Sequence, residues 1–441
     1  MLFLYIMVGV PVGSDSTSLT EIAEACHDYS KPNNLNSFRY VYMTDGSRAG
    51  TASGTGDLKY SQFIGKNVAY NVTGTGLLAT GTEDQAFTSW SSFAASRGLE
   101  YFMLASPNNQ HCEPRAFTTT GSTHATLTWS QPSGTSQSQY RLEDRAHAMA
   151  ISRSGVMVIG SEEVGSTVSS SPRNAMFVHT DATNFSSGYW SPGYDGTTGF
   201  GTKIGHLVQS GNDLYIPTRA GLYGGYQMVT ILKIDMSSSP HSWLYGWSSV
   251  FHYGHSIQLS ENLDRLIIDN GPGASVRVYT TNGSNISEEQ ALTTTGATGH
   301  VYCNSDCSVI VSGNNIWHRS GTTWTAANTD EITNRNVDAR TCDISDDGTI
   351  VVYKRDGISS DSGGADQLNH FHYHNTNNRW YYTGNSNLGT TGENNRFLGG
   401  GFSSTNIGVR NDGLVIGKWD SFANSGNNQP KAYKGTIGVK K

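Results

Sequence analysis

Short runs that alternate between apolar and polar residues recur along the chain, and tight polar turns separate them. The clearest example is residues 343–353, in which apolar residues flank an Asp-Gly dipeptide. Asp-Gly between two apolar runs is a strong hairpin signal, because glycine adopts a positive φ without a Cβ clash. Two more alternating runs follow at 370–374 and 379–382. Residues 341–382 therefore predict four short antiparallel strands, a sheet too thin to bury both of its faces alone.

The same hairpin pattern recurs at other places in the sequence, giving seven copies in all. Each copy has two apolar runs joined by a turn rich in Asp, Asn, Ser and Gly. Repeats at roughly 40 to 80 residues predict the blades of a β-propeller, in which radial packing covers both faces of each small sheet. The further copies are 150–160, 257–268 and 407–417, with weaker copies at 70–81, 207–216 and 301–313.

The second half of the unit also recurs, as a strand that leads to a tryptophan. Residues 176–178 lead to Trp190, and residues 229–234 lead to Trp243. We therefore expect an all-β chain with a single β-propeller of about seven four-stranded blades at residues 46–441. Six or eight blades also fit the irregular spacing. A long β-sandwich is the alternative fold, but it does not explain one pattern that returns seven times.

Composition favours turns and strands, and it argues against a nucleic-acid partner and a membrane span. Charged residues make up only 15% of the chain while glycine occurs 51 times, which suits tight turns better than charged helix surfaces. The net charge is −7 and no basic run precedes Lys440 and Lys441, so we expect no nucleic-acid partner. No stretch of about eighteen apolar residues occurs, so we expect no membrane span.

The chain has five cysteines, and an odd, sparse count argues against a disulfide-stapled secreted scaffold. Cys303 and Cys307 flank a predicted turn. A local disulfide in an oxidising compartment and a pair of free buried thiols both fit this spacing, and free thiols are favoured. A zinc site would need a second Cys or His pair beside them, and the sequence shows none there.

The N-terminal residues form an apolar run with no basic residue before it and no small-residue cleavage site, which argues against a signal peptide. Such a run must be covered, either by a sheet edge of its own chain or by another subunit. A strand from the opposite terminus often completes the last sheet of a propeller, so residues 1–12 or 39–42 are candidates for that strand. The apolar residues of this assembly segment are Leu2, Phe3, Leu4, Tyr5 and Ile6.

A short helix is predicted next in the sequence. Ser18 and Glu21 form a capping box, and Leu19 and Ile22 lie on the apolar face of the helix. We expect residues 1–45 to form an arm that contains this one small helix and that docks the propeller to an oligomeric assembly.

Two resemblances to known families follow from particular segments. The SLTEIA and NLNSF segments, within residues 16–42, resemble the small N-terminal module of structural and tail proteins of marine bacteriophages. Residues 256–284 and 343–380 are similar to FG-GAP-like propeller repeats, which are related in pattern to the integrin α-subunit propeller. Integrin-type repeats hold calcium with alternating Asp and Asn residues, but Ile344 occupies a ligand position here, so calcium is not expected.

These resemblances imply a non-enzymatic virion structural or appendage protein of a marine bacteriophage, of the tail-fibre, tail-tip or capsid-decorating type. The expected partners are other virion proteins and a glycan or protein of the host surface, and the expected location is the extracellular particle. The alternatives are a virion-associated or secreted propeller enzyme that hydrolyses glycans, and a secreted carbohydrate-binding adhesin. No G-x-S-x-G, H-E-x-x-H or Walker A motif occurs, which favours a protein that is not an enzyme.

Three alternating histidines are candidate metal ligands. His370, His372 and His374 share one face of a predicted strand, while Phe371 and Tyr373 share the other. Imidazoles on one strand face can bind a transition metal when symmetry-related chains complete the ligand shell. Otherwise the aromatic residues pack between blades and the histidines face solvent or polar neighbours. No other cofactor is expected.

An aromatic loop is the candidate ligand-binding site. Phe185, Tyr189, Trp190 and Tyr194 alternate with Gly, Ser and Asp residues. Flat aromatic rings can stack on sugar rings while small polar residues donate hydrogen bonds, which suits a glycan. The alternative is that Trp190 closes a blade, and this structural role is favoured.

Overall fold

A computed structural model of the chain describes residues 42–43, 68–69, 72–80, 92–107, 112–121, 123–126, 148–160, 176–179, 189–191, 198–222, 227–237, 242–244, 249–251, 256–269, 275–281, 285–294, 300–335, 337–355, 367–375, 378–387, 395–396, 407–421 and 430–437.

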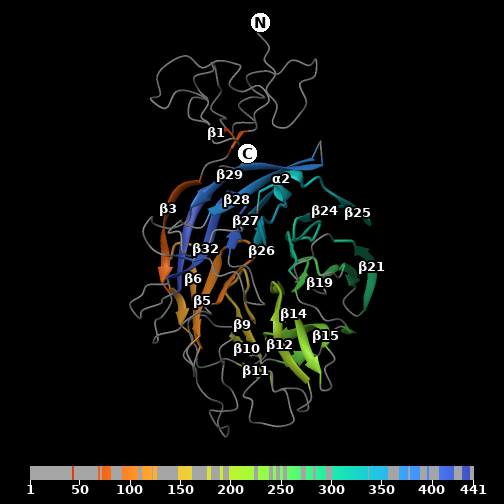
Figure 1. Ribbon diagram of the computed structural model, residues 1–441. Helices are drawn as coiled ribbons and strands as arrows, with labels where there is room; N and C mark the ends of the chain where they lie inside the picture. Colours follow the sequence, from red (N-terminus) through yellow and green to blue (C-terminus); the bar gives the residue numbers. More distant parts are fainter. Residues whose placement is uncertain are drawn as a thin grey trace, which may run out of the picture.

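The strands of these residues form seven antiparallel sheets of four to six strands, together with one small two-stranded sheet (Figure 1). We number the seven larger sheets I to VII. In six of them the strands follow one another in the sequence, so each sheet is built from one continuous stretch of chain. The all-β prediction is confirmed.

The first three sheets cover the N-terminal half of this series. Sheet I contains β4 (Ser92–Ala95), β5 (Tyr101–Pro107), β6 (Cys112–Thr118) and β7 (Thr123–Thr126). Sheet II contains β8 (Ala148–Ile151), β9 (Met157–Gly160), β10 (Met176–His179) and β11 (Tyr189–Ser191). Sheet III contains β12 (Thr198–Ile204), β13 (Val208–Ser210), β14 (Asp213–Leu222), β15 (Gln227–Asp235), β16 (Ser242–Leu244) and β17 (Ser249–Phe251).

The next three sheets repeat the same four-stranded order. Sheet IV contains β18 (Ser256–Leu259), β19 (Arg265–Asp269), β20 (Val276–Thr281) and β21 (Ile286–Leu292). Sheet V contains β22 (Tyr302–Cys303), β23 (Val309–Ser312), β24 (Asn315–Ser320) and β25 (Thr323–Ala326). Sheet VI contains β26 (Val337–Ile344), β27 (Ile350–Arg355), β28 (Gln367–His374) and β29 (Arg379–Asn387).

Sheet VII combines strands from distant parts of the sequence. It contains β3 (Val72–Thr80), β30 (Asn395–Arg396), β31 (Ile407–Val409), β32 (Leu414–Ser421) and β33 (Pro430–Ile437). β3 pairs with β33, with Leu77 opposite Tyr433. A strand near the N-terminus therefore completes the sheet that the C-terminal strands begin.

The general expectation that an N-terminal strand completes the last sheet is thus met, but the choice of strand was wrong. β3 makes the pairing instead of residues 39–42, because Tyr42 belongs to β1 (Tyr42–Met43) and pairs with β2 (Val68–Ala69). The predicted hairpin at 70–81 is also wrong, since β3 is one continuous strand across it. The seventh hairpin is formed instead by β4 and β5.

Consecutive sheets pack face to face through buried apolar side chains. Separate hydrophobic clusters join sheets II and III, III and IV, IV and V, V and VI, VI and VII, and VII and I. Between sheets I and II, β8 contacts β4 and β5. Figure 1 shows the sheets following one another around the molecule in this order. Each sheet therefore has a neighbour on both faces, as the repeat pattern requires.

Sheet VI illustrates how alternation produces two buried faces. Val351 and Phe371 are paired in register and belong to the cluster shared with sheet V. Val352 belongs to the cluster shared with sheet VII, and its partner in register is His370. Neighbouring residues of a strand point to opposite faces, and both faces are apolar here because both are covered.

Within the described residues, one short helix, α2 (Asp330–Thr333), lies between β25 and β26, and the sequence pattern did not predict it. The predicted helix with Leu19 and Ile22 lies outside the described residues, as do residues 1–12 with Leu2, Phe3, Leu4, Tyr5 and Ile6. In the part of the chain that the structure describes, no helix is long and apolar enough to cross a membrane.

Gly348 gives a test of how tightly the Asp-Gly turn is packed. Its φ is +71°, and a Cβ would lie 2.7 Å from Val309 Cγ2 on the neighbouring sheet. We expect Gly348→Ala to lower the free energy of unfolding by about 2–3 kcal/mol, from backbone strain plus this clash. Gly321 has a φ of +61° with nothing within 4 Å of its Cβ position, so Gly321→Ala should cost only about 1 kcal/mol. Equal losses in urea titrations of both variants would contradict the close approach.

Candidate functional site

The turns between the first two strands of the sheets share one backbone design. In sheets I, II, IV and VI the first turn residue is a serine whose Oγ accepts a hydrogen bond from a backbone N–H four or five residues later. In sheet V Asn304 Oδ1 accepts the equivalent bond from Val309 N. The fourth turn residue has a positive φ in each case: Leu99, Gly155, Leu263, Cys307, Gly348 and, in sheet VII, Gly413.

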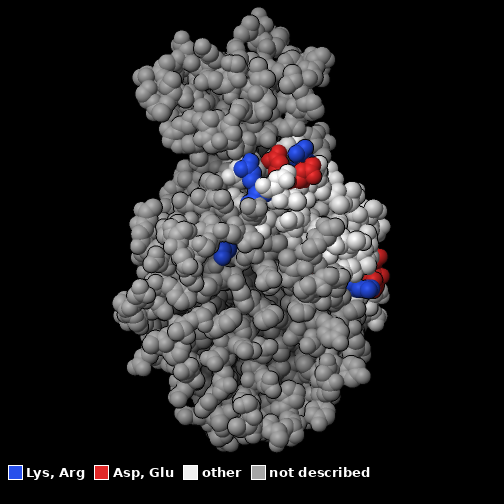
Figure 2. All heavy atoms as spheres, in the orientation of Figure 1, with Lys and Arg blue, Asp and Glu red and all other residues white. Residues whose placement is uncertain are grey.

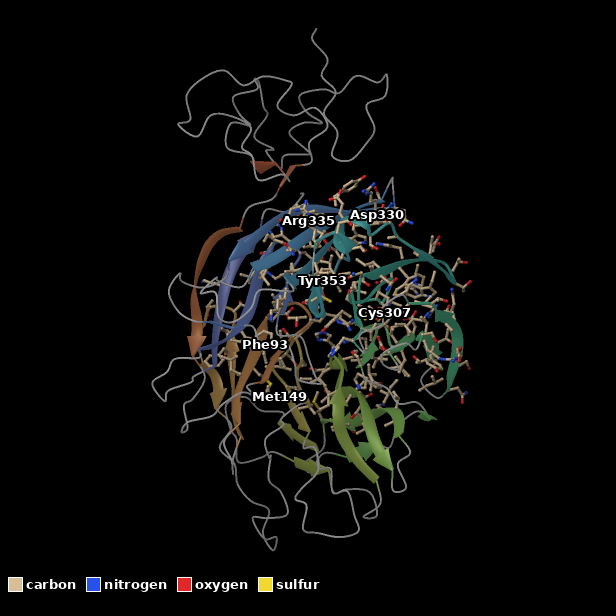
Figure 3. All side chains as sticks on the ribbon, in the orientation of Figure 1. Phe93, Met149, Cys307, Asp330, Arg335 and Tyr353 are labelled. Atoms are coloured by element: carbon tan, nitrogen blue, oxygen red, sulfur yellow. The ribbon has the colours of Figure 1, made fainter. Side chains whose placement is uncertain are left out.

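This shared design places the second turn residue of each copy at the same point of the repeat. These residues are Arg97, Arg153, Glu261, Ser305, Asp346 and Asn411. They come from six different sheets, and the contacts below bring them together. Figure 3 labels Phe93, Met149, Cys307 and Tyr353 around this region, each from a different sheet.

Arg153 is the hub of this region. Its Nε donates to Glu261 Oε1 at 2.6 Å and its Nη1 donates to Glu100 Oε1 at 2.8 Å. Its Nη2 donates to Asp346 Oδ2. The three carboxylates belong to sheets IV, I and VI, so one guanidinium on sheet II joins turns from four sheets.

Arg97 joins sheet I to sheets IV and V through backbone oxygens. It is 7% exposed. Its Nη1 donates to the carbonyl oxygens of Asn304 at 3.1 Å and Ser305 at 2.7 Å, and its Nη2 donates to that of Leu259 at 3.0 Å. We call Arg97, Arg153, Glu100, Glu261 and Asp346 the central cluster.

Direct bonds between the turns extend the central cluster to the remaining sheets. Glu261 N donates to Ser305 O at 2.8 Å, and Asp347 N donates to Asn411 Oδ1 at 3.1 Å. Ser305 Oγ donates to Asp346 O at 3.2 Å. On the other side, Ser154 Oγ donates to Gln209 Oε1 of sheet III. Turns of six sheets, together with Gln209 of β13 in sheet III, therefore belong to one hydrogen-bonded region.

Burial and the two arginines together shift the pKa values of neighbouring groups. Burial tends to raise the pKa of Glu100, but hydrogen bonds from Ser96 and Arg153 outweigh burial and the pKa lies below its usual range. For Asp346, burial prevails over Arg153 and raises the pKa. Burial, with the charges of Arg97 and Arg153, lowers the pKa of His206 to about 3. His206 is therefore neutral at physiological pH.

A pocket of about 520 Å³ opens beside Arg153 and Glu261. Turn residues of sheets II and III form most of its wall: Ser152, Arg153, Ser154, Leu207, Val208, Gln209 and Gly211. Its charged groups, Arg153 and Glu261, are already bound to each other. The pocket can admit a small ligand, and its described lining residues include one carboxylate, that of Glu261, where acid and base catalysis by carboxylates needs two.

Asp343 lies between sheets VI and VII, where its Oδ2 accepts a hydrogen bond from Val409 N at 2.9 Å. Burial raises its pKa to about 7, although the bonds from Val409 and Ile344 oppose this effect. The folded state therefore binds a proton that the unfolded state releases near its ordinary pKa of 3.8. The stability that this proton provides is present at low pH and is lost as pH rises to about 7.

We expect Asp343→Asn to remove this pH dependence, because asparagine keeps an acceptor for Val409 N but carries no charge. Relative to the wild type, the variant should gain about 2 kcal/mol in free energy of unfolding between pH 5 and pH 8. Urea titrations at the two pH values measure the difference. Asp412→Asn is the control, since Asp412 is exposed and its pKa is lowered mainly by Arg410. A constant difference between Asp343→Asn and wild type would contradict the assignment.

Two of the three candidate metal ligands lie inside the molecule. His370 is 0% exposed and His372 is 8% exposed, and His370 Nδ1 is 3.1 Å from Thr383 Oγ1. The side chain of His374 lies outside the described residues. Among the side chains that the structure describes, no group of three His, Cys, Asp or Glu residues is placed to hold a metal ion. A metal at this strand stays a prediction.

The candidate glycan loop is described only in part. Tyr189 and Trp190 belong to β11, and Trp190 is paired in register with Phe177 of β10. Phe185 and Tyr194 lie outside the described residues. The backbone pairing places Trp190 at the edge strand of sheet II, the position at which a blade-closing residue is expected.

A second group of charged side chains lies on the surface over α2 and the start of β29 (Figure 2). Glu331 Oε1 is 3.7 Å from Arg379 Nη2, and the Arg335 guanidinium lies 3.7 Å from the centroid of the Tyr382 ring. One contact is a partly buried ion pair, with 17% of the Glu331 side chain exposed, and the other is a cation–π contact to the buried Tyr382 ring. They do not form a field of one sign for a charged partner.

Comparison with known proteins gives distant structural similarities. No protein-family model matches the sequence, and no curated protein matches it. The β-propeller domain of Cps50 (Swd1) from Myceliophteria thermophila is 8% identical, with 80% of this chain and 99% of that chain covered and a TM-score of 0.44. A Bacteroides fragilis protein described as a candidate 6-phosphogluconolactonase is 12% identical, with 78% and 97% covered and a TM-score of 0.41. Trypanosoma rangeli sialidase is 12% identical, with 90% and 58% covered and a TM-score of 0.39. These similarities are too distant to assign an activity, a ligand or a partner.

Proposed function

We propose that sheets I to VII are the blades of one closed seven-bladed β-propeller that acts as a non-enzymatic structural and attachment module. Three features support closure of the ring. Each sheet packs against the next, sheet VII packs against sheet I, and sheet VII takes strands from both ends of the sheet series. Equivalent turns of six of the sheets also meet in one hydrogen-bonded region, which a two-layer sandwich does not allow.

The central cluster is the observation that supports a structural role. An enzyme of this architecture needs groups at the mouth of the ring that remain available to a substrate. Here Glu100, Glu261 and Asp346 all bind Arg153. Arg97 donates hydrogen bonds to backbone carbonyl oxygens. Charges that are paired in this way cross-link the turns, so the blades form a rigid body whose outer surfaces are left for partners.

The proposed setting is a bacteriophage virion, in which residues 1–45 dock the propeller to other virion proteins and the outer surface contacts a host glycan or protein. The support for this setting is the sequence resemblance within residues 16–42. Mass spectrometry of purified particles tests it, because peptides of this chain should remain with the particles through a density gradient. Their complete loss from the particle fraction would remove the virion assignment.

Catalysis is tested separately with the full chain and a panel of bacterial surface polysaccharides. We expect no new reducing ends above those of a heat-denatured sample, while binding to some polysaccharides or to whole cells is measurable by sedimentation. New reducing ends that disappear in Glu261→Gln or Asp346→Asn would show a catalytic central cluster and overturn the proposal. Both variants keep similar side-chain volumes, and circular dichroism checks that they are folded.

A further inference from the structure

The turn of sheet V contains two thiols that no other turn of the series has. Cys303 ends β22 and Cys307 is the fourth residue of the turn, where the equivalent residues are Gly or Leu. The two sulfur atoms are 2.8 Å apart, and both side chains are buried, with 4% and 0% exposed. The φ of Cys307 is +51°, a conformation that a side chain rarely adopts and that brings its sulfur back towards Cys303.

Arg97 of the central cluster lies against this pair. Its Nη2 is 3.8 Å from Cys303 Sγ, and its Nη1 binds the carbonyl oxygens of Asn304 and Ser305, two of the three residues between the cysteines. The guanidinium therefore fixes the turn that separates the thiols. It also places a positive charge beside one sulfur and not beside both equally.

The pKa values of the two thiols are shifted in opposite directions. Burial raises the pKa of Cys303, but the hydrogen bond from Cys307 and the charge of Arg97 outweigh it and the net effect lowers the pKa. Burial and the neighbouring Cys303 raise the pKa of Cys307. A cysteine whose thiolate is stabilised by a cation beside a second thiol is the arrangement that favours attack on an oxidant followed by disulfide closure.

We propose that Cys303 and Cys307 are an oxidation site, at which a hydroperoxide converts the two thiols into a disulfide within the turn of sheet V. The Cys303 thiolate attacks one peroxide oxygen, so an S–O bond forms, the O–O bond breaks, and hydroxide leaves and becomes water with the Cys303 proton. Cys307 sulfur then attacks Cys303 sulfur, the S–O bond breaks, and a second hydroxide leaves with the Cys307 proton. Two thiols and one hydrogen peroxide thus give one disulfide and two waters.

The consequence for the propeller follows from the position of the loop. The disulfide closes a ring around the residues whose carbonyl oxygens accept hydrogen bonds from Arg97. Oxidation therefore fixes the acceptors of Arg97 and should raise the melting temperature of the full chain. This inference is independent of the proposed virion setting, since it depends only on the geometry of sheets I and V.

Peptide mapping tests the proposal on the intact wild-type chain. The reduced protein is treated with hydrogen peroxide, denatured, alkylated with iodoacetamide and digested with trypsin. Arg277 and Arg319 bound a tryptic peptide that contains both thiols and no other Lys or Arg. We expect this peptide to lose both alkyl groups and to be about 2 Da lighter than its fully reduced, unalkylated form. The peptide with Cys342, a buried thiol of the core between sheets V and VI, should stay alkylated.

Cysteine and arginine variants test whether disulfide formation needs both thiols and the charge of Arg97. Cys303→Ser and Cys307→Ser should each abolish the mass loss, while Cys342→Ser should leave it unchanged. Arg97→Gln should slow disulfide formation about tenfold at pH 7, and Arg97→Lys should restore part of the rate. The proposal is overturned if the 277–319 region of the treated wild type keeps two alkyl groups, or if Cys303 accumulates sulfinic acid without a cross-link. Because the mapping uses wild-type protein, it remains decisive even if an Arg97 variant does not fold.

Discussion

Replacing Arg153 with alanine is expected to lower the free energy of unfolding by about 2–4 kcal/mol. The substitution removes hydrogen bonds to Glu100, Glu261 and Asp346 at once and leaves three neighbouring carboxylates without their shared cation. The loss should be smaller than for a fully buried ion pair, because 35% of the Arg153 side chain is exposed. Urea denaturation followed by tryptophan fluorescence measures the change.

Arg410→Ala is the matched control for this prediction. Arg410 belongs to the equivalent turn of sheet VII, but its ion pair with Asp412 is exposed and lies within a single turn. We expect a loss of at most about 1 kcal/mol. If Arg153→Ala and Arg410→Ala were equally mild, the central cluster would be an ordinary surface feature and would not hold the sheets together.

Removing residues 1–81 is expected to abolish cooperative folding, whereas removing only residues 1–45 should not. The longer deletion takes away β3, which leaves the edge of β33 unpaired and uncovers the apolar surface that completes sheet VII. The shorter deletion spares every strand of sheets I to VII and should change the free energy of unfolding by no more than about 1 kcal/mol.

The same pair of deletions separates folding from assembly. Analytical ultracentrifugation should show a folded but less associated chain when the proposed docking arm, residues 1–45, is removed. An unfolded product from the shorter deletion would mean that the arm is part of the propeller itself. A cooperative thermal transition from the longer deletion would mean that folding does not depend on the pairing of β3 with β33 in sheet VII.

Much of the fold could be predicted because each hairpin is a local signal. About ten neighbouring residues contain both the alternation with a period of two and a turn residue suited to positive φ. The hairpins at 343–353 and 407–417 were therefore recognised from the sequence. The hairpin of β4 and β5 was missed, although the hairpin at 257–268, which was recognised, likewise has a leucine, Leu263, at the positive φ. Pairing of β3 with β33 joins residues that are far apart in the sequence, and no local pattern encodes it.

The central cluster could not be found by scanning for catalytic or metal-binding motifs, because its five members are spread over the turns of four sheets. A signal was present, however. When the turns are aligned on their first residue, the second residue is Arg97, Arg153, Glu261 or Asp346 in four copies. Opposite charges at one repeat position predict an ion-pair network only if the turns lie close together. That the turns lie close together can be seen only in the tertiary structure.

A double-mutant cycle between Arg153 and Asp346 tests the convergence of the turns most directly. The two residues are 193 positions apart and belong to sheets II and VI, which are not neighbours in the series. We predict that Arg153→Ala and Asp346→Ala show a coupling energy of about 1–3 kcal/mol in the double variant. Additive effects, with a coupling below about 0.3 kcal/mol, would contradict the central cluster and the ring of sheets around it.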